Sequence, residues 1–99
     1  MQKVMLPAVY ITASGKNETL YTGVTSNLPQ RIWQHKNGFF KGFSLEHRCN
    51  ILVYYAVFDT MEQAITMEKR IKKWHRYWKI ELIEQENPGW HDLYDSILD

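Results

Sequence analysis

Two segments near the N-terminus alternate apolar and polar residues. Residues 8–13 and 19–25 have this alternation, and the segment between them, SGKNE, is rich in turn-forming residues. The pattern predicts two strands joined as a β-hairpin. Tyr10 and Tyr21 have the same parity in the two strands, so cross-strand pairing can place both phenols on one face of the sheet. Taken alone, such tyrosines are more often parts of the core or of the sheet surface.

The hairpin is followed by the pattern of a helix with clear end signals. The segment SNLPQ, residues 26–30, offers a serine or an asparagine as the N-cap and a proline in the first turn, and Gly38 is placed to end the helix. Arg31 and His35 are separated by one helical turn and therefore share a helix face. An exposed pair of this kind usually has no function by itself.

A third strand and a second amphipathic helix follow a loop at 38–49. Residues 50–57 are almost continuously apolar or aromatic, which indicates a central or covered strand. Asp59 or Thr60 caps the next helix, and Gln63 completes a capping box with Thr60. The apolar stripe of this helix consists of Ala64, Met67, Ile71 and Trp74.

Two further helices are predicted toward the C-terminus. The first spans about residues 77–86, has Trp78, Leu82 and Ile83 facing inward, and ends at the sequence NPGW. A short last helix contains Leu93, Tyr94 and Ile97. The element order ββαβααα predicts an α+β fold, in which a small three-stranded antiparallel sheet is flanked by helices. The 99 residues suit one domain, 1–99, with a core at about 8–95.

The composition indicates an ordinary soluble protein. Hydrophobic residues make up 44% and charged residues 23% of the chain. No stretch approaches the roughly 18 apolar residues of a membrane span. The lone Cys49 excludes an internal disulfide framework and a cysteine-rich zinc site. These features favour a cytoplasmic protein.

The net charge of +1 conceals a strong asymmetry. Residues 69–79, KRIKKWHRYWK, contain six of the 12 Lys and Arg residues and no acid, whereas residues 80–99 contain six of the 11 Asp and Glu residues. With its interleaved aromatic residues, the basic segment suits contact with a nucleic-acid backbone. The alternative is a solvated helix face whose charges are balanced by the acidic segment.

Glu68 is the most informative acidic residue. It lies at the edge of the apolar stripe of its helix, so we expect its carboxylate to be partly buried and to need a partner. That partner is either a hard metal ion such as Mg²⁺, which typically takes one or two carboxylates together with waters and phosphates, or a cation of the protein. Lys72 at i+4 and Arg31 across the core are the candidate cations.

Three segments of the chain carry a family resemblance. They are AVYITASGKNETLYTGVTSNLPQRIWQHKNG, TMEQAITMEKRIKKW and WKIELIEQENPGWHDLY. In this order they look like the signature strands with the arginine helix, the glutamate helix and the closing segment of the GIY-YIG nuclease superfamily, most closely of its small stand-alone, UPF0213-like members. AVY stands where the family has Gly-Ile-Tyr, and YTG stands where it has Tyr-Ile-Gly. The resemblance covers about residues 8–95.

The resemblance implies a set of site residues. They are the signature tyrosines Tyr10 and Tyr21, the motif glycine Gly23, the catalytic arginine Arg31, His35 at a position where many members have histidine, the metal-binding Glu68 and the supporting Asn87. The implied activity is endonucleolytic hydrolysis of phosphodiester bonds with one Mg²⁺ ion, or Mn²⁺ in its place.

These residue types suit that chemistry. Glu68 would hold the ion, and Arg31 would stabilise the charge that builds on a phosphoryl oxygen. Tyr10 would take a proton from the attacking water, directly or through a network with Tyr21, and this requires that its pKa be lowered from about 10. His35 is a candidate to relay the proton.

The implied partner is nucleic acid, with DNA preferred to RNA. We expect phosphate contacts that are independent of sequence from Lys36, Lys41, Arg48, Lys69, Lys72, Lys73 and Arg76. We expect neither a membrane nor an obligate protein partner. Two alternatives remain: a nucleic-acid-binding module that keeps the fold without catalysis, and a protein-interaction domain that docks a partner through the aromatic residues of GFFKGF and the acidic segment 80–99.

Overall fold

The computed structural model describes residues 6–39, 42 and 47–98. Its sheet has three antiparallel strands in the order β2-β1-β3: β1 (Ala8–Ala13), β2 (Leu20–Thr25) and β3 (Ile51–Val57). The helices are α1 (Leu28–Lys36), α3 (Met61–Lys73), α4 (Arg76–Glu86) and a short 3₁₀ helix, η1 (Tyr94–Ile97). The predicted α+β fold with a three-stranded antiparallel sheet is confirmed.

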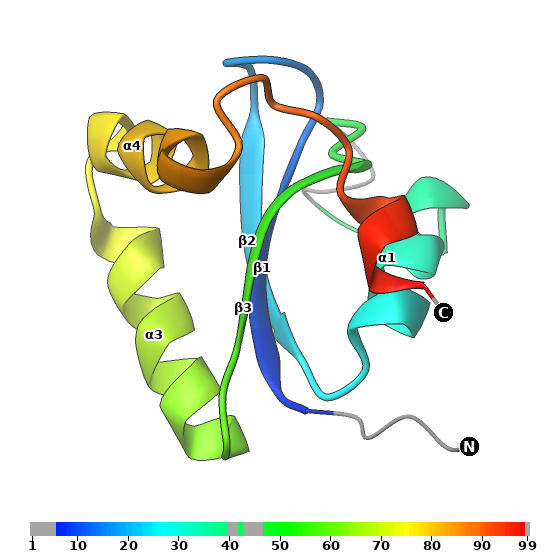
Figure 1. Cartoon of the computed structure of the whole chain (residues 1–99), viewed down its shortest axis with the longest axis vertical. Coiled ribbons are helices and arrows are strands. Elements are labelled where there is room, and N and C mark those ends of the chain that lie inside the picture. The colour runs from blue at the N-terminus through cyan, green and yellow to red at the C-terminus, as the bar shows by residue number, and fades with distance from the viewer. Residues whose placement is uncertain (1–5, 40–41, 43–46, 99) are drawn as a thin grey trace.

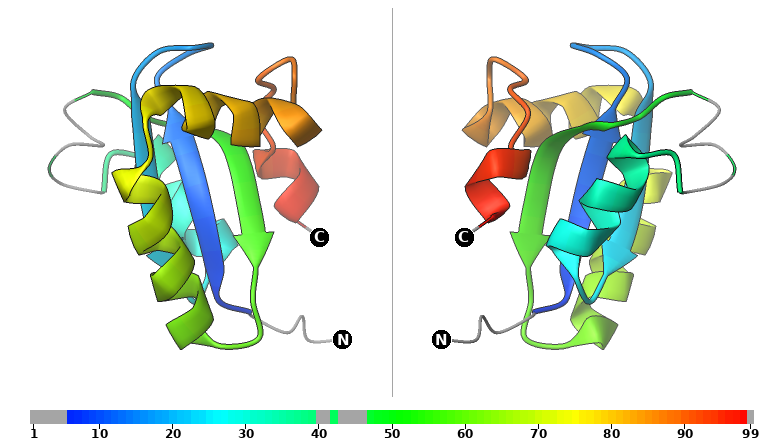
Figure 2. Two further views of the ribbon diagram at one scale, coloured as in Figure 1. Left: turned by 90° about the vertical axis from the view of Figure 1, so that its left-hand side faces the viewer. Right: turned by 90° about the vertical axis from the view of Figure 1, so that its right-hand side faces the viewer.

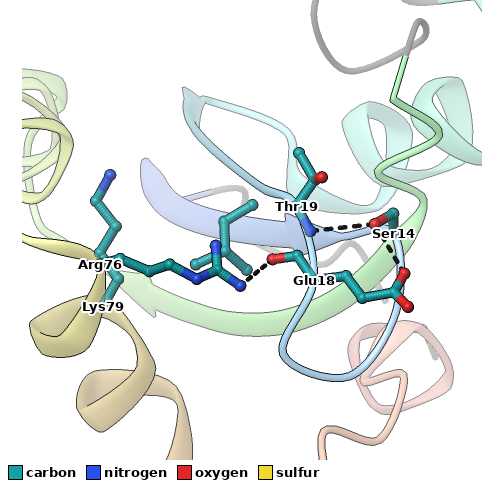
Figure 3. Close-up of a pocket in the computed structure, with 6 residues that line it drawn as sticks. Ser14, Glu18, Thr19, Arg76 and Lys79 are labelled. Atoms are coloured by element: carbon teal, nitrogen blue, oxygen red, sulfur yellow. Dashed lines mark hydrogen bonds between the residues drawn. The ribbon is translucent and has the colours of Figure 1, made fainter.

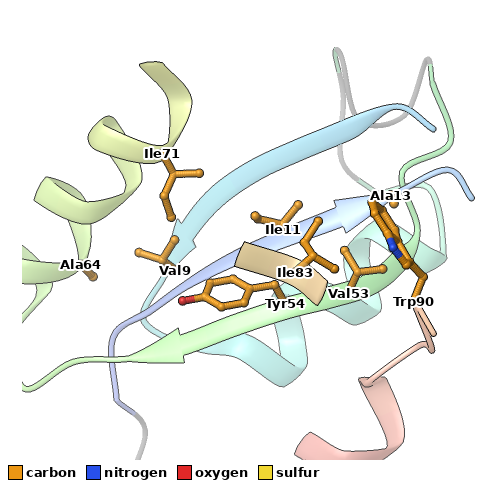
Figure 4. Close-up of a cluster of buried hydrophobic side chains, with 9 residues drawn as sticks. All are labelled: Val9, Ile11, Ala13, Val53, Tyr54, Ala64, Ile71, Ile83 and Trp90. Atoms are coloured by element: carbon orange, nitrogen blue, oxygen red, sulfur yellow. The ribbon is translucent and has the colours of Figure 1, made fainter. Parts of the chain in front are cut away.

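The helices form two layers, one on each face of the sheet. Figures 1 and 2 show α3 and α4 on one face and α1 with η1 on the other. β1 contributes side chains to the core on both faces, because successive residues of a strand point to opposite faces of the sheet. Val9 and Ile11 pack with Ile71 and Ile83 under α3 and α4 (Figure 4), whereas Tyr10 belongs to the cluster under α1 and η1.

The central strand is β1 rather than the more continuously apolar β3. β3 lies at an edge of the sheet, and its long apolar run reflects coverage on both faces. Leu52 packs in the cluster under α1, and Val53 packs in the cluster under α3 and α4. The prediction of a covered strand was therefore correct, but the strand is not central.

The helix ends follow the predicted local signals. The Oδ1 atom of Asn27 accepts the backbone N–H of Gln30 at 3.2 Å and caps α1. Thr60 and Gln63 form the capping box of α3, with hydrogen bonds of 3.2 and 3.3 Å. In the apolar stripe of α3, Ala64 and Ile71 are buried.

The orientation of α4 differs from the prediction at one position. Ile83 is fully buried, but Trp78 is 54% exposed. At 3.6 residues per turn, Trp78 lies about 140° around the helix from Ile83, so both cannot face the core. Trp78 instead makes an edge contact with Trp74, with ring centroids 6.1 Å apart.

Part of the aromatic loop lies outside the described residues. Of the sequence GFFKGF, the aromatic residue that the structure describes is Phe39, which is exposed and stacks on Trp33 with ring centroids 5.3 Å apart. Lys41 lies outside the described residues. Among the helices that the structure describes, none has the length and apolar character needed to cross a membrane.

The segment that follows α4 runs along the outer edge of β3. The backbone N–H of Leu93 donates to the Leu52 carbonyl at 2.8 Å, and the Leu52 N–H donates to the Asp92 carboxylate at 3.2 Å. A register shift in the β1–β3 pairing leaves Val53 without a paired residue in β1. The Asn87 side chain donates to the Val53 carbonyl at 3.1 Å, so this segment occupies the edge of β3.

Asn87 is the residue that ties this segment together. Its side chain also donates to the carbonyl of His91 at 2.9 Å and accepts the His91 N–H at 3.0 Å, and the residue is 5% exposed. Loss of the Asn87 side chain would leave buried backbone groups without hydrogen-bond partners, and this lowers the stability of the folded state. Asn87 is therefore a structural anchor between α4 and β3.

We predict that Asn87→Ala lowers the free energy of unfolding by about 2–3 kcal/mol, because several buried hydrogen bonds are lost together. Urea denaturation followed by circular dichroism measures this change. Gln85→Ala, at an exposed position of the same helix, is the control and should change stability by less than about 0.5 kcal/mol. Equal stability of the two variants would contradict the anchoring role.

Candidate active site

The candidate site is built around the pair Tyr10 and Gly23. These residues are directly opposite each other in the β1–β2 ladder. A Cβ atom at position 23 would lie 2.4 Å from the Tyr10 hydroxyl oxygen, far inside van der Waals contact. Glycine at this position is therefore required for the Tyr10 ring to extend across β2.

Three rings meet on this face of the sheet. Tyr21 pairs with Thr12, two pairs along the ladder from Tyr10 and Gly23, and the ring centroids of Tyr10 and Tyr21 are 6.3 Å apart. His35 comes from α1 and packs against both phenols, at centroid distances of 5.4 and 5.3 Å. The expected placement of both tyrosines on one face is therefore observed.

A hydrogen bond of 2.8 Å joins the Tyr10 hydroxyl to Nε2 of His35. Arg31, one turn before His35 on α1, is close enough to Tyr10 to lower the pKa of its phenol. In the bond between Tyr10 and His35, the phenol donates when Nε2 is unprotonated and accepts when Nε2 carries the proton.

Glu68 acts on Tyr10 from α3 through its charge. The negative charge of its carboxylate raises the pKa of the Tyr10 phenol and is the smallest of the causes that act on it. Its carboxylate also forms an ion pair with Lys72, at 2.8 Å between Oε2 and Nζ, and its side chain is 13% exposed. The partial burial expected for Glu68 is therefore observed, and the protein cation that contacts it is Lys72.

The pKa of Tyr10 is raised above its ordinary value. Burial is the largest cause, and Tyr21 and Glu68 act in the same direction. Arg31 opposes this shift through its hydrogen bond and its charge, but its effect is smaller. A phenolate of Tyr10 is therefore disfavoured, which does not support the expectation that this tyrosine alone deprotonates a water.

His35 is neutral at physiological pH. Burial lowers its pKa to about 4, and the positive charge of Arg31 contributes. A neutral imidazole at hydrogen-bond distance from a phenol is a proton acceptor. Tyr10 and His35 thus form a buried pair in which a proton can move from oxygen to nitrogen.

The members of the site differ in their access to solvent. Tyr10 is 0% exposed and His35 is 7% exposed, whereas Tyr21 and Arg31 are intermediate. Tyr21, Arg31 and Glu68 are therefore the more accessible members of the site, and Tyr10 and His35 are the buried ones. Asn87 lies apart from these residues, since its hydrogen bonds go to Val53 and His91 at the β3 edge.

The predicted phosphate-contacting residues divide into two groups. Lys36 is bound to the Asn50 carbonyl at 2.9 Å and to Asp92, so its charge holds α1 to the C-terminal segment. Its role as a phosphate contact stays a prediction that competes with this ion pair, and nothing in the local sequence indicated Asp92 as its partner. Exposed cations remain at Arg48, Lys69, Lys72, Lys73 and Arg76.

Lys79 belongs to the basic segment 69–79 but was not among the individually named phosphate contacts. Lys79 lies one turn after Arg76 on α4, and both line the same cleft beside the hairpin. The spacing i, i+3 places two residues on one helix face and would have identified the pair.

The residues of the site suit a weakly held divalent ion. Across the described part of the chain, no cluster of three or more His, Cys, Asp or Glu residues could enclose a metal. One partly exposed carboxylate, Glu68, matches Mg²⁺, which keeps several waters and binds substrate phosphates. The ion would have to replace Lys72 at this carboxylate.

Comparison with known proteins places the chain among a group of small proteins. The family model for the GIY-YIG catalytic domain matches residues 6–81. A UPF0213 protein of Staphylococcus haemolyticus is 35% identical over 77 residues, which cover 78% of this chain and 93% of that protein. A UPF0213 protein of Clostridium perfringens is 38% identical over 72 residues, with 73% and 77% covered.

A solved structure shares the fold. The solution NMR structure of a UPF0213 protein from Bacillus halodurans aligns with a TM-score of 0.54 at 24% identity. The alignment covers 96% of this chain and all of that chain.

We predict that His35 titrates near pH 4, and that stability falls as the pH is lowered from about 7 to about 4. The unfolded histidine, with a pKa of about 6.5, binds its proton first, so protonation in this range favours the unfolded chain. NMR titration of the His35 ring measures the pKa. Urea unfolding at the two pH values should show a loss of about 2–3 kcal/mol that His35→Gln removes.

The control for this titration is His75→Gln, at an exposed position, which should keep the pH-dependent loss of stability. A midpoint for His35 at pH 6 or above would contradict the burial argument.

We predict that Gly23→Ala disrupts the site, because the added methyl group occupies the position of the Tyr10 hydroxyl. Overpacking of this kind costs about 1–3 kcal/mol, and displacement of Tyr10 should raise the pKa of His35. Gly15→Ala is the control, because its new Cβ meets only the flexible end of Glu18. An unchanged His35 titration in Gly23→Ala would show that the close contact is not needed.

Proposed function

The protein belongs to the GIY-YIG catalytic-domain family, a nuclease superfamily, and on this premise we propose that it is a metal-dependent endonuclease. Its substrate is nucleic acid, with DNA preferred, and its cleavage depends little on sequence. The observation that carries the proposal is the cluster of two phenols and an imidazole from β1, β2 and α1, with the charges of Arg31 and Glu68 within electrostatic reach of Tyr10.

Arg31 is the residue proposed to bind the scissile phosphate. It is partly exposed and lies beside the buried Tyr10–His35 pair, where its positive charge lowers the pKa of His35. A guanidinium has five donors in a fixed fork, so it can hold Tyr10 and a non-bridging phosphate oxygen together. Charge that develops on that oxygen during the reaction would be stabilised by Arg31.

Tyr10 and His35 are proposed to remove the proton of the attacking water. As the water oxygen bonds to phosphorus, its proton passes to the Tyr10 oxygen, and the Tyr10 proton passes to Nε2 of His35 at 2.8 Å. No free phenolate forms, so the raised pKa of Tyr10 does not forbid the step. Because Tyr10 is fully buried, the step requires a movement that admits the water to its hydroxyl.

Glu68 is proposed to hold one divalent ion, Mg²⁺ or Mn²⁺. When bound, the ion would polarise the phosphate and stabilise the 3′-oxygen as its bond to phosphorus breaks. The ammonium of Lys72 leaves the carboxylate in this exchange and becomes available to a substrate phosphate. The exposed cations Lys69 and Lys73 are on the same helix and extend the positive surface. Phosphate contacts of this kind carry no sequence information.

A nucleic-acid-binding module without catalysis is the second candidate. The complete burial of Tyr10 favours it, because a base that cannot meet water cannot act. The two candidates predict the same binding surface but differ in metal-dependent cleavage.

We predict that the protein nicks supercoiled plasmid in the presence of Mg²⁺ or Mn²⁺, and that Glu68→Gln lowers the rate by about a hundredfold or more. Gel analysis of plasmid forms over time measures the rate, and thermal melting checks the fold. Glu62→Gln, at an exposed position of the same helix, should keep the wild-type rate.

Equal nicking by wild type and Glu68→Gln would contradict the assignment of Glu68. Tight plasmid binding by the wild-type protein without nicking in either metal would favour the non-catalytic candidate.

A further inference from the structure

A cleft of about 550 Å³ lies between the β-hairpin and the start of α4. It is lined by Ser14, Glu18, Thr19, Leu20, Arg76 and Lys79 (Figure 3). The first four come from the hairpin, and the two cations come from the first turn of α4. The cleft is separate from the cluster around Tyr10.

The positive charge around this cleft is concentrated. The pKa of Lys79 is lowered by burial and then by the charges of Arg76 and Lys72, so three cations lie within electrostatic reach of one another. The first turn of α4 contains no acidic residue, and the N-terminal end of a helix is itself positive. Cations at this end of a helix are unfavourable unless an anion accompanies them.

Glu18, the acidic residue that lines the cleft, is hydrogen-bonded within the hairpin. The Glu18 carboxylate accepts the Ser14 hydroxyl at 3.2 Å, and Figure 3 shows it directed toward Ser14 rather than toward α4. The backbone carbonyl of Glu18 accepts one N–H of the Arg76 guanidinium. This bond fixes the guanidinium at the cleft, and a guanidinium has further donors for a second ligand.

The cleft lies near Glu68 rather than on the sheet face that holds Tyr10. Leu20, which lines the cleft, packs on the α3 and α4 side of the sheet, whereas Tyr21, the next residue along β2, packs with Tyr10 on the other side. Lys72, which acts on Lys79, is also the ion-pair partner of Glu68. A polyanion that occupies the site at Glu68 would therefore pass beside Arg76 and Lys79.

We propose that this cleft binds a backbone phosphate of the nucleic acid adjacent to the scissile one, with Arg76 and Lys79 as its ligands. The inference rests on the proposed function, because it names a second contact for the same substrate. Arg76 supplies oriented donors, and Lys79 supplies a mobile point charge.

The experiment measures binding of a short fluorescent DNA duplex over a range of salt concentrations, with EDTA present to prevent cleavage. We compare the wild type, Lys79→Gln and the double variant Arg76→Gln/Lys79→Gln. Lys79→Gln keeps the bond between Arg76 and the hairpin, so it reports on binding even if the double variant is unstable.

Each lost phosphate contact should lower the slope of log affinity against log salt by about 1 and weaken binding several-fold. Arg70→Gln is the matched control, because Arg70 lies beside Glu62 and Thr66 on another side of α3 and should keep the wild-type slope. A second arm titrates inorganic phosphate at constant ionic strength and follows the backbone amides of Ser14 and Arg76 by NMR.

The outcomes separate the two proposals. If the wild type nicks plasmid and the cleft variants keep its salt slope and affinity, this inference is overturned and the proposed function stands. Saturation of the cleft by free phosphate together with an unchanged DNA slope would also overturn it, in favour of a site for small anions. If the wild type does not bind nucleic acid, both proposals fall.

Discussion

The hydrogen-bonding demand of one buried hydroxyl group organises the candidate site. A buried polar group without a partner costs about 1–3 kcal/mol, and Tyr10 is fully buried on the central strand. His35 on α1 supplies its hydrogen-bond partner, and Arg31, one turn earlier, lowers its pKa. The ring can reach them only because Gly23 leaves its path across β2 open. The buried hydroxyl of Tyr10 on β1 therefore constrains which residues can stand at position 23 of β2 and position 35 of α1.

The site also depends on the position of β2 at the edge of the sheet. α1 and α3 cover opposite faces, yet Glu68 on α3 acts electrostatically on Tyr10, which packs under α1. β2 is an edge strand, and Gly23 has no side chain to separate the two faces at that point. The basic cleft begins beside the same strand, so β2 connects the two.

Local signals in the sequence predicted the caps, the hairpin and the shared face of the two tyrosines, because each depends on neighbouring residues or on strand parity. The use of Lys36 could not be predicted this way, since its partner Asp92 is 56 residues away. The raised pKa of Tyr10 was not predicted either. It follows mainly from burial, which depends on how distant parts of the chain pack around this residue. Trp78 was misplaced because Ile83, and not Trp78, sets the buried face of α4.

The path of the C-terminal segment has a consequence for self-association. An edge strand offers unpaired backbone groups to any other strand and is a common start of aggregation. On β3, both backbone groups of Leu52 and the carbonyl of Val53 are already bound by Leu93, Asp92 and Asn87. The segment therefore covers the edge of β3 at Leu52 and Val53, and a chain cut before Asn87 would expose these backbone groups to pairing with another strand.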